Sequence, residues 1–212
     1  MPLHPRPSKI VCVGKNYRAH AAELGTEVPA QPLIFLKPPS ALLSAGEPIV
    51  LPPGVGRVDY EGEIAVVIGR RARGVSEADA WSHVGAVAPL NDVTARDLQK
   101  SDGQWTRSKG FDTFCPVGEP VPARELDPAQ LEVETRVNGQ VRQRGRASDM
   151  KFSIPLLISW ISNVMTLEEG DLLATGTPEG IGALSPGDVV EVEIPGVGVL
   201  RNPVAAAQSG RA

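Results

Sequence analysis

The sequence predicts a mainly β protein with a few short helices, within the α+β class. The chain has 212 residues, which is long enough to bury a core without disulfides or a structural metal. Glycine and proline number 22 and 20, a share that argues against a helical bundle and favours short elements joined by turns. Hydrophobic residues make up 42% and charged residues 22%, as in a folded globular protein. We therefore expect one domain over residues 1–212, with loose arms at residues 1–8 and 205–212.

Several segments in the first half are rich in β-branched residues or alternate between apolar and polar side chains. They predict strands at residues 9–13, 33–36, 61–68 and 84–90. After the first of these, Asn16 is a plausible N-cap for a short helix that ends near Gly25. Residues 44–57 contain three prolines and three glycines, which predict a long loop rich in turns.

Three other helices are predicted from polar residues at their starts. Ser76 begins a short helix, and Thr94 with Asp97 has the spacing of a capping box, which predicts a helix over residues 94–100. Ser153 is suited to cap the longest helix, whose apolar residues recur at helical spacing.

The second half contains a clear hairpin signal. Residues 131–137 alternate between polar and apolar, and Asn138 and Gly139 supply the two positive-φ positions of a type I′ turn. Two more strands are expected at residues 171–175 and 188–194, separated by a loop rich in glycine and proline. The order of the strands does not follow from the sequence.

Charge and targeting signals exclude several classes of protein. The formal net charge is -4 and basic residues form no run, so we expect no nucleic-acid partner. No apolar stretch is long enough to span a bilayer, and the N-terminus lacks the apolar region of a signal peptide. The two cysteines, Cys12 and Cys115, lie far apart, which favours buried free thiols and a cytoplasmic location.

Glu61 and Glu63 provide the strongest local signal for chemistry. Two residues apart on a strand, their side chains point to the same face, roughly 7 Å apart along the backbone. Both strand faces continue with apolar residues, so the carboxylates are expected to be half-buried. Two such carboxylates are stabilised by a hard divalent cation with oxygen ligands, such as Mg²⁺. The alternative is a solvated strand face with no ligand.

Asp92 and the helix after it offer a second group of polar side chains. Asp92 ends an apolar strand, where side chains from several strands converge. Arg96 and Gln99 are three residues apart and share a helix face, so they suit an anionic substrate bound beside a metal. The alternative is that Asp92 belongs to a turn and Arg96 to the surface.

His20 and Glu23 form a possible acid–base pair on the first helix. Their spacing allows the carboxylate to orient the imidazole while the other ring nitrogen accepts a proton from water. An incidental pair on a helix surface is the alternative. Lys37 and Lys109 are able to hold a carboxylate or polarise a carbonyl, although single lysines are usually solvated. Thr177 lies in a glycine-rich turn, which suits an anion site or merely a tight corner.

Six segments together resemble the fumarylacetoacetate hydrolase family, in the family's order and over about residues 9–203. They are Gly14-Lys-Asn-Tyr-Arg-Ala-His20-Ala-Ala-Glu23, Phe35-Leu-Lys37-Pro, Tyr60-Glu61-Gly-Glu63, Asn91-Asp92-Val-Thr-Ala-Arg96-Asp-Leu-Gln99, Lys109-Gly-Phe-Asp, and Gly170-Asp-Leu-Leu-Ala-Thr-Gly-Thr177-Pro-Glu-Gly. Each is weak alone, but the ordered set is specific. The resemblance is closest to the short single-domain members, which include acylpyruvate hydrolases and oxaloacetate decarboxylases.

The resemblance implies a mixed β-roll with several layered sheets, a Mg²⁺ or Mn²⁺ ion and a homodimer. The implied metal ligands are Glu61, Glu63 and Asp92, and the implied catalytic residues are His20, Glu23 and Lys109. The implied substrate contacts are Tyr17, Lys37, Arg96, Gln99 and Thr177. Two features depart from the larger members. The chain has no room for their N-terminal domain, and residues 11–14 lack the further acidic ligand that precedes the histidine.

The function implied is a divalent-metal-dependent reaction of a 2-oxo or β-diketo acid through a stabilised enolate. The lack of a fourth acidic ligand argues against fumarylacetoacetate itself as the substrate. His20 and Glu23 favour C–C hydrolysis of an acylpyruvate, and decarboxylation of oxaloacetate is equally open. An alternative is the 2-hydroxyhepta-2,4-diene-1,7-dioate isomerase or 5-oxopent-3-ene-1,2,5-tricarboxylate decarboxylase of aromatic catabolism. A non-catalytic binder of organic acids is a more remote alternative.

Overall fold

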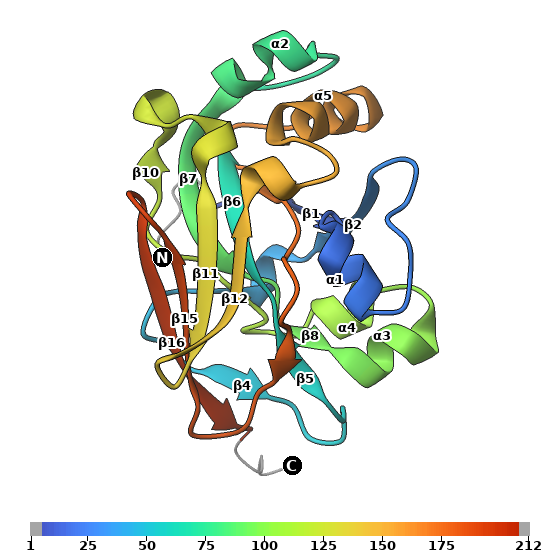
Figure 1. The fold of residues 1–212 in the computed structure, drawn as a ribbon, viewed down its shortest axis with the longest axis vertical. Coiled ribbons are helices and arrows are strands. Elements are labelled where there is room, and N and C mark those ends of the chain that lie inside the picture. Colours follow the sequence, from blue (N-terminus) through green and yellow to red (C-terminus); the bar gives the residue numbers. More distant parts are fainter. Residues whose placement is uncertain (1–5, 208–212) are drawn as a thin grey trace.

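The computed structural model describes residues 6–207, and strands dominate this part of the chain (Figure 1). The largest sheet has six strands in the order β10-β7-β6-β13-β1-β2. Its strands are β1 (Ile10–Gly14), β2 (Leu33–Lys37), β6 (Gly62–Ile68), β7 (Val84–Asn91), β10 (Val121–Pro122) and β13 (Leu172–Ala174). Only β1 and β13 pair in parallel within it. The mainly β class that the sequence predicts is confirmed.

A second sheet has five strands in the order β12-β11-β15-β16-β4. Its strands are β4 (Ile49–Leu51), β11 (Glu132–Val137), β12 (Gln140–Arg146), β15 (Val189–Ile194) and β16 (Gly198–Ala206). Two small sheets complete the layers: β5 (Val58–Tyr60) lies between β8 (Thr94–Ala95) and β14 (Gly182–Ala183), while β3 (Leu42–Leu43) pairs with β9 (Cys115–Pro116). This layered arrangement matches the fold that the resemblance implies.

The helices lie at two places around the sheets. Figure 1 shows α2 (Glu77–Ala80) and α5 (Ile154–Val164) together at one end, and α1 (Arg18–Glu23), α3 (Arg96–Asp102) and α4 (Thr106–Lys109) on one flank. Short 3₁₀ turns are η1 (Pro39–Ala41), η2 (Trp81–His83), η3 (Ala123–Glu125), η4 (Pro128–Gln130) and η5 (Ala147–Asp149). None of the helices within residues 6–207 combines the length and apolar character needed to cross a bilayer.

The main core lies between the two large sheets and beneath α5. Val66 and Val87 of the six-stranded sheet belong to the same buried cluster as Val133 and Val192 of the five-stranded sheet. The predicted Ser153 cap and the predicted hairpin are confirmed. The Ser153 hydroxyl accepts a hydrogen bond from the N–H of the third helix residue, and the β11–β12 turn has two consecutive positive-φ residues. Both cysteines are free and buried.

Three local predictions were wrong. Tyr17, not Asn16, caps α1, because the Asn16 side chain is buried and bonded to the main chain. Thr94 does not begin a helix: it pairs with β5 in β8, and its hydroxyl donates to the Asp92 carbonyl. The predicted loop over residues 44–57 contains the strand β4, which forms because these residues pair with the distant strand β16.

The ends of the chain differ in part from the predicted loose arms. At the C-terminal end, Ala205 and Ala206 belong to β16, and residues 208–212 lie outside the described residues. At the N-terminal end, Ser8 is anchored by hydrogen bonds from its N–H and hydroxyl to the Asp171 carboxylate. Residues 1–5 lie outside the described residues.

Candidate active site

Three carboxylates converge where β5, β6 and β7 meet. The antiparallel β6–β7 pairing sets Gly62 opposite Asn91, and the Asp92 N–H donates to the Glu61 carbonyl at 2.8 Å. As a result Glu61, Glu63 and Asp92 each place a carboxylate oxygen within 4.8 Å of the others, and all three are buried. The sequence suggested that these acids share one site, and the strand pairing brings them together.

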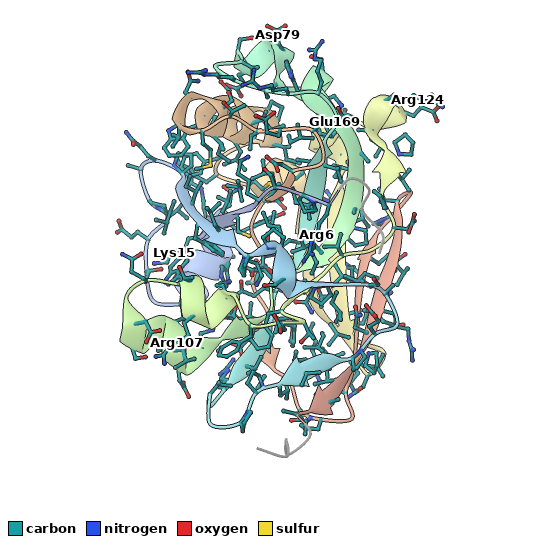
Figure 2. The ribbon with its side chains drawn as sticks, turned by 180° about the vertical axis from the view of Figure 1, so that it is seen from behind. Arg6, Lys15, Asp79, Arg107, Arg124 and Glu169 are labelled. Atoms are coloured by element: carbon teal, nitrogen blue, oxygen red, sulfur yellow. The ribbon has the colours of Figure 1, made fainter. Side chains whose placement is uncertain are left out.

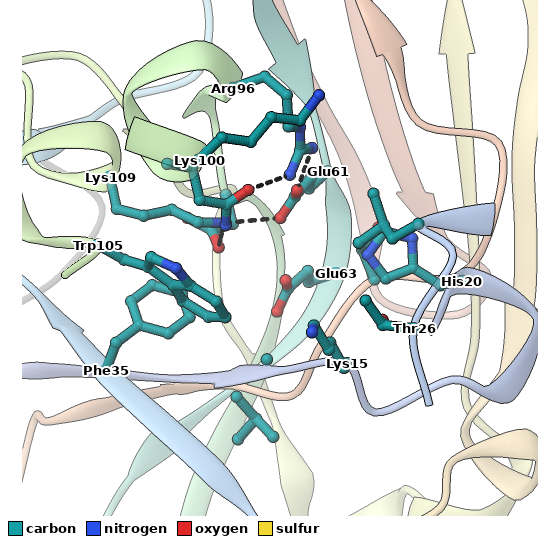
Figure 3. A pocket seen from close by; sticks show the side chains of 16 residues that line it. Lys15, His20, Thr26, Phe35, Glu61, Glu63, Arg96, Lys100, Trp105 and Lys109 are labelled. Carbon is teal, nitrogen blue, oxygen red and sulfur yellow. Dashed lines mark hydrogen bonds and ion pairs between the residues drawn. The ribbon is translucent and has the colours of Figure 1, made fainter. Parts of the chain in front are cut away.

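Three cations hold two of these carboxylates. Lys109 Nζ lies 2.8 Å from Glu61 Oε2 and 2.5 Å from Asp92 Oδ2. Arg96 Nη2 donates to Glu61 Oε1 at 2.5 Å (Figure 3). Lys37 Nζ donates to Asp92 Oδ1 at 2.6 Å. All three cations are buried, so these ion pairs are formed away from water.

Glu63 has no such partner among the described residues. Its Oε2 accepts one hydrogen bond, from the Gly176 N–H at 2.7 Å, and no lysine or arginine forms an ion pair with it. Burial raises the pKa of Glu63, and repulsion from Asp92 and Glu61 raises it further. A buried carboxylate without a counter-charge beside two other acids is the environment that a divalent cation stabilises. The residues present therefore fit a Mg²⁺ or Mn²⁺ ion held by Glu61, Glu63 and Asp92.

The neighbouring groups remain charged at neutral pH. Burial alone would raise the pKa of Glu61, but Lys109 and Arg96 outweigh it and hold this pKa well below its usual range. Burial alone would lower the pKa of Lys109, but Asp92 and Glu61 raise it overall. Lys109 is thus an ammonium donor in this site and is unsuited to act as a general base.

His20 lines the same pocket from α1. Its Nδ1 lies 3.2 Å from Glu23 Oε2, while Glu23 Oε1 accepts from the Gly180 N–H at 3.1 Å. The predicted pairing of these two residues is therefore present. A carboxylate on Nδ1 orients the ring and leaves Nε2 for proton transfer. Figure 3 shows His20 on the opposite side of Glu63 from Trp105 and Phe35.

The pocket is small and chemically divided. Its cavity volume is about 190 Å³, below the range of about 300–1,000 Å³ that is common for drug-sized ligands. One wall is aromatic, because the Phe35 and Trp105 rings meet edge to face with centroids 5.2 Å apart. The carboxylates and cations form the base. Such a cavity suits a small organic acid.

Most of the site residues predicted from the sequence lie at this pocket. Arg96, Gln99, Lys109 and Thr177 line it together with His20 and the three carboxylates. Lys37 does not line the pocket, in contrast to the predicted substrate contact, because its buried ammonium is bonded to Asp92. Glu23 does not line it either and lies behind His20.

Tyr17 does not line the pocket, in contrast to the predicted substrate contact. Its ring packs beside Gly145 of β12, on the other side of α1. Its position as the N-cap of α1 directs the ring toward the core.

Other residues of the site were not singled out from the sequence. Asp59 is fully buried and accepts from Arg96 Nε at 2.9 Å, which fixes the guanidinium that contacts Glu61. Gln143 of β12 accepts from the Gly62 N–H and donates to the Thr177 hydroxyl, so it links the second large sheet to the acid-bearing segment. In the sequence, Asp59 stands next to the acidic motif of Glu61 and Glu63, which weakly indicates a role in the site. Gln143 is about 80 residues from that motif, and nothing in its sequence context indicates such a role.

The chain is similar to a known family and to several known proteins. It matches the fumarylacetoacetate (FAA) hydrolase C-terminal family over residues 9–205. The chain belongs to this family. Oxaloacetate tautomerase YisK of Bacillus subtilis is 46% identical over an alignment 213 positions long, which covers 94% of this chain and 71% of that protein.

Two solved structures of the family have similar folds. The 5-carboxymethyl-2-hydroxymuconate delta-isomerase of Mycobacterium smegmatis superposes with a TM-score of 0.89 at 48% identity, covering 96% of this chain and 81% of that one. The fumarylpyruvate hydrolase of Pseudomonas aeruginosa, solved with Mn²⁺ and pyruvate, also gives a TM-score of 0.89, at 33% identity and with 95% and 91% coverage. The relatives of this fumarylacetoacetate hydrolase family member thus bear the names of enzymes with different reactions.

Proposed function

We propose that this family member is a divalent-metal-dependent enzyme of 2-oxo acids, and that its principal reaction is the keto–enol tautomerisation of oxaloacetate. The observation that carries the proposal is the buried group of three carboxylates, in which Glu63 lacks a counter-charge and His20 faces the same small cavity. The name of the Bacillus subtilis relative supports this choice of substrate. Tautomerisation is a reaction that the sequence alone did not suggest.

A bound Mg²⁺ or Mn²⁺ ion would polarise the 2-oxo group and stabilise negative charge on its oxygen. His20 then takes a proton from C3 of the keto form, and the electron pair of that C–H bond moves into the C2–C3 double bond. The 2-oxo oxygen receives a proton, so the reaction moves one proton and releases no fragment. Glu23 keeps the imidazole oriented throughout.

Lys109, Arg96 and Gln99 have binding roles in this proposal. Lys109 and Arg96 stay cationic, and both already contact carboxylate oxygens at the base of the pocket. They are therefore suited to hold the carboxylate next to the 2-oxo group. Arg96 Nη1 donates to Gln99 Oε1 at 2.6 Å, which leaves the Gln99 amide NH₂ as a further donor.

The His20–Glu23 contact also favours hydrolysis of an acylpyruvate as a second candidate reaction. In that reaction His20 removes a proton from water, and the hydroxide attacks the distal carbonyl. The C–C bond then breaks and its electron pair forms the enolate of pyruvate. The two reactions share the enolate, so they differ mainly in whether a water molecule reaches the substrate beside His20.

The test compares both reactions with and without metal. Decay of enol-oxaloacetate absorbance measures tautomerisation, and pyruvate release from acetylpyruvate measures hydrolysis, each with Mg²⁺ and with EDTA. We expect metal-dependent tautomerisation, together with loss of both activities in His20→Ala. Absence of metal-dependent turnover of either substrate would overturn the proposal and favour a non-catalytic binder of organic acids.

A further inference from the structure

Charge is distributed unevenly between the base and the mouth of the pocket. Among the described residues, the acidic side chains that line the pocket are Glu61, Glu63 and Asp92, and all three lie at its base. Two lysines at its mouth, Lys15 and Lys100, also line it, and neither side chain forms an ion pair or hydrogen bond with the residues that the structure describes. Figure 3 shows Lys100 beside Arg96 and Lys15 on the opposite side, near Thr26.

Lys15 adopts an unusual backbone conformation to occupy this place. It directly follows β1 and has φ of 60°, one of three positive values at non-glycine positions within residues 6–207. A left-handed conformation is unfavourable for a lysine and would be free of strain for a glycine. Strained residues of this kind concentrate at functional sites, where the side chain is needed. Figure 2 shows Lys15 on the flank of the molecule where α3 and α4 lie.

Lys100 reaches the mouth from α3. It comes four residues after Arg96, so the two side chains lie on one face of the helix, one turn apart. Arg96 is buried against Glu61, whereas Lys100 is exposed. The helix therefore places one cation at the base and a second, unpaired cation further out.

The base of the pocket is electrically balanced without these lysines. It holds four buried acids and four cations, so the formal charges sum to zero. Arg57, Lys37, Arg96 and Lys109 form ion pairs with Asp59, Glu61 and Asp92, while Glu63 forms none with the described residues. A divalent cation adds two positive charges, and the carboxylate beside a 2-oxo group removes one. Lys15 and Lys100 then add two more positive charges that a substrate with a single carboxylate leaves without a partner.

We propose that Lys15 and Lys100, on opposite sides of the pocket mouth, flank a binding subsite for a second carboxylate, at the end of the substrate remote from the 2-oxo group. The inference rests on the proposed function, because it assumes that a 2-oxo acid occupies the base of the pocket. The subsite makes the enzyme selective for dicarboxylic 2-oxo acids over acids of similar shape with one carboxylate. Lys15 and Lys100 are thus specificity-determining residues.

The experiment uses two probes that differ only in the distal group. 2-Oxoglutarate ends in a carboxylate, and 2-oxopentanoate has a methyl group in its place. Calorimetric titration with saturating Mg²⁺ measures the Kd of each probe for the wild type, for Lys15→Gln combined with Lys100→Gln, and for the control Lys151→Gln. Lys151 is an exposed lysine that lies outside the pocket.

We expect the wild type and the control to bind 2-oxoglutarate at least about tenfold more tightly, as for a charge-assisted contact that is partly screened by water. The double variant should lose most of that preference and bind 2-oxopentanoate unchanged. Lys100→Glu, an exchange at an exposed helix position, sets a carboxylate against the charge of Lys15 and should also remove most of the preference.

Two results would contradict the subsite in different ways. If both probes bind the wild type equally, or if the preference survives in the double variant, the subsite is wrong while the proposed function stands. If the wild type binds neither probe and does not turn over oxaloacetate, the proposed function fails together with the subsite.

Discussion

Replacing Glu63 by glutamine should lower the thermal stability of the metal-bound protein, and should leave the stability of the metal-free protein unchanged or slightly higher. The exchange keeps the shape of the side chain and an oxygen for the Gly176 N–H, and removes only the charge. Without metal, the charge is repelled by Glu61 and Asp92, whose oxygens lie within 4.8 Å. One such repulsion amounts to about 3 kcal/mol at an effective dielectric constant of 20, before the nearby lysines offset part of it. The metal-free variant should therefore be as stable as the wild type or more stable by about 1 kcal/mol.

With metal, the same exchange should remove most of the stabilisation. At a Mg²⁺ concentration of 100 times Kd, binding stabilises the folded wild type by about 2.7 kcal/mol. For a chain of 212 residues, this raises Tm by about 5–11 °C. If the loss of one carboxylate weakens binding 100-fold, the stabilisation falls to about 0.4 kcal/mol, or about 1 °C.

Thermal unfolding of both proteins with Mg²⁺ and with EDTA measures the two effects together. Glu179→Gln is the matched control, because Glu179 is exposed on the loop that follows Gly176; it should keep the full shift. A full Mg²⁺ shift in Glu63→Gln would refute the assignment of Glu63 as a ligand. A metal-free variant that is several kcal/mol less stable would show that the Glu63 charge is already stabilised by the protein without metal.

Three further predictions concern one residue that supports the site and two buried polar anchors elsewhere in the fold. Asp59→Asn should lower kcat/KM for oxaloacetate about tenfold by loosening Arg96, and should keep the Mg²⁺ shift; an unchanged kcat/KM would contradict this. Asn16→Ala breaks three buried hydrogen bonds, two of them to Phe152, and should lower the urea-unfolding free energy by about 3 kcal/mol, whereas a loss below about 1 kcal/mol would contradict it. Burial alone would raise the pKa of Asp171, but hydrogen bonds from neighbouring groups lower it overall. The Asp171 carboxylate therefore contributes its full stabilisation of the folded protein above about pH 5, and this contribution is lost as pH falls below about 4. In urea unfolding at pH 3–6, Asp171→Asn should make the unfolding free energy depend less on pH than in the wild type.

Elements whose hydrogen bonds are local could be predicted from the sequence. The β11–β12 hairpin depends on Asn138 and Gly139, and the start of α5 depends on Ser153, so each signal lies within a few residues. β4 could not be predicted, because residues 49–51 form a strand by pairing with β16, which lies about 150 residues later in the sequence. The Thr94 capping box failed for the same reason: pairing with β5 offers this segment other hydrogen bonds.

The acids of the site were easier to predict than the residues that hold them. Glu61 and Glu63 stand out because charged residues beside an apolar strand are unusual. The direction of the Tyr17 ring depends on its packing beside Gly145 of β12, which is about 130 residues away in the sequence and which no local pattern encodes. Gln143 supports the site from another sheet and has an ordinary sequence context.

The central claim is that Glu61, Glu63 and Asp92 bind one divalent cation. Anomalous diffraction from crystals grown with Mn²⁺ and oxalate tests it most directly, because the manganese signal locates the ion without reference to the protein atoms. We expect one strong peak within about 2.5 Å of an oxygen from each of the three carboxylates. A well-ordered crystal with no peak between them, or with the ion bound at other residues, would contradict it.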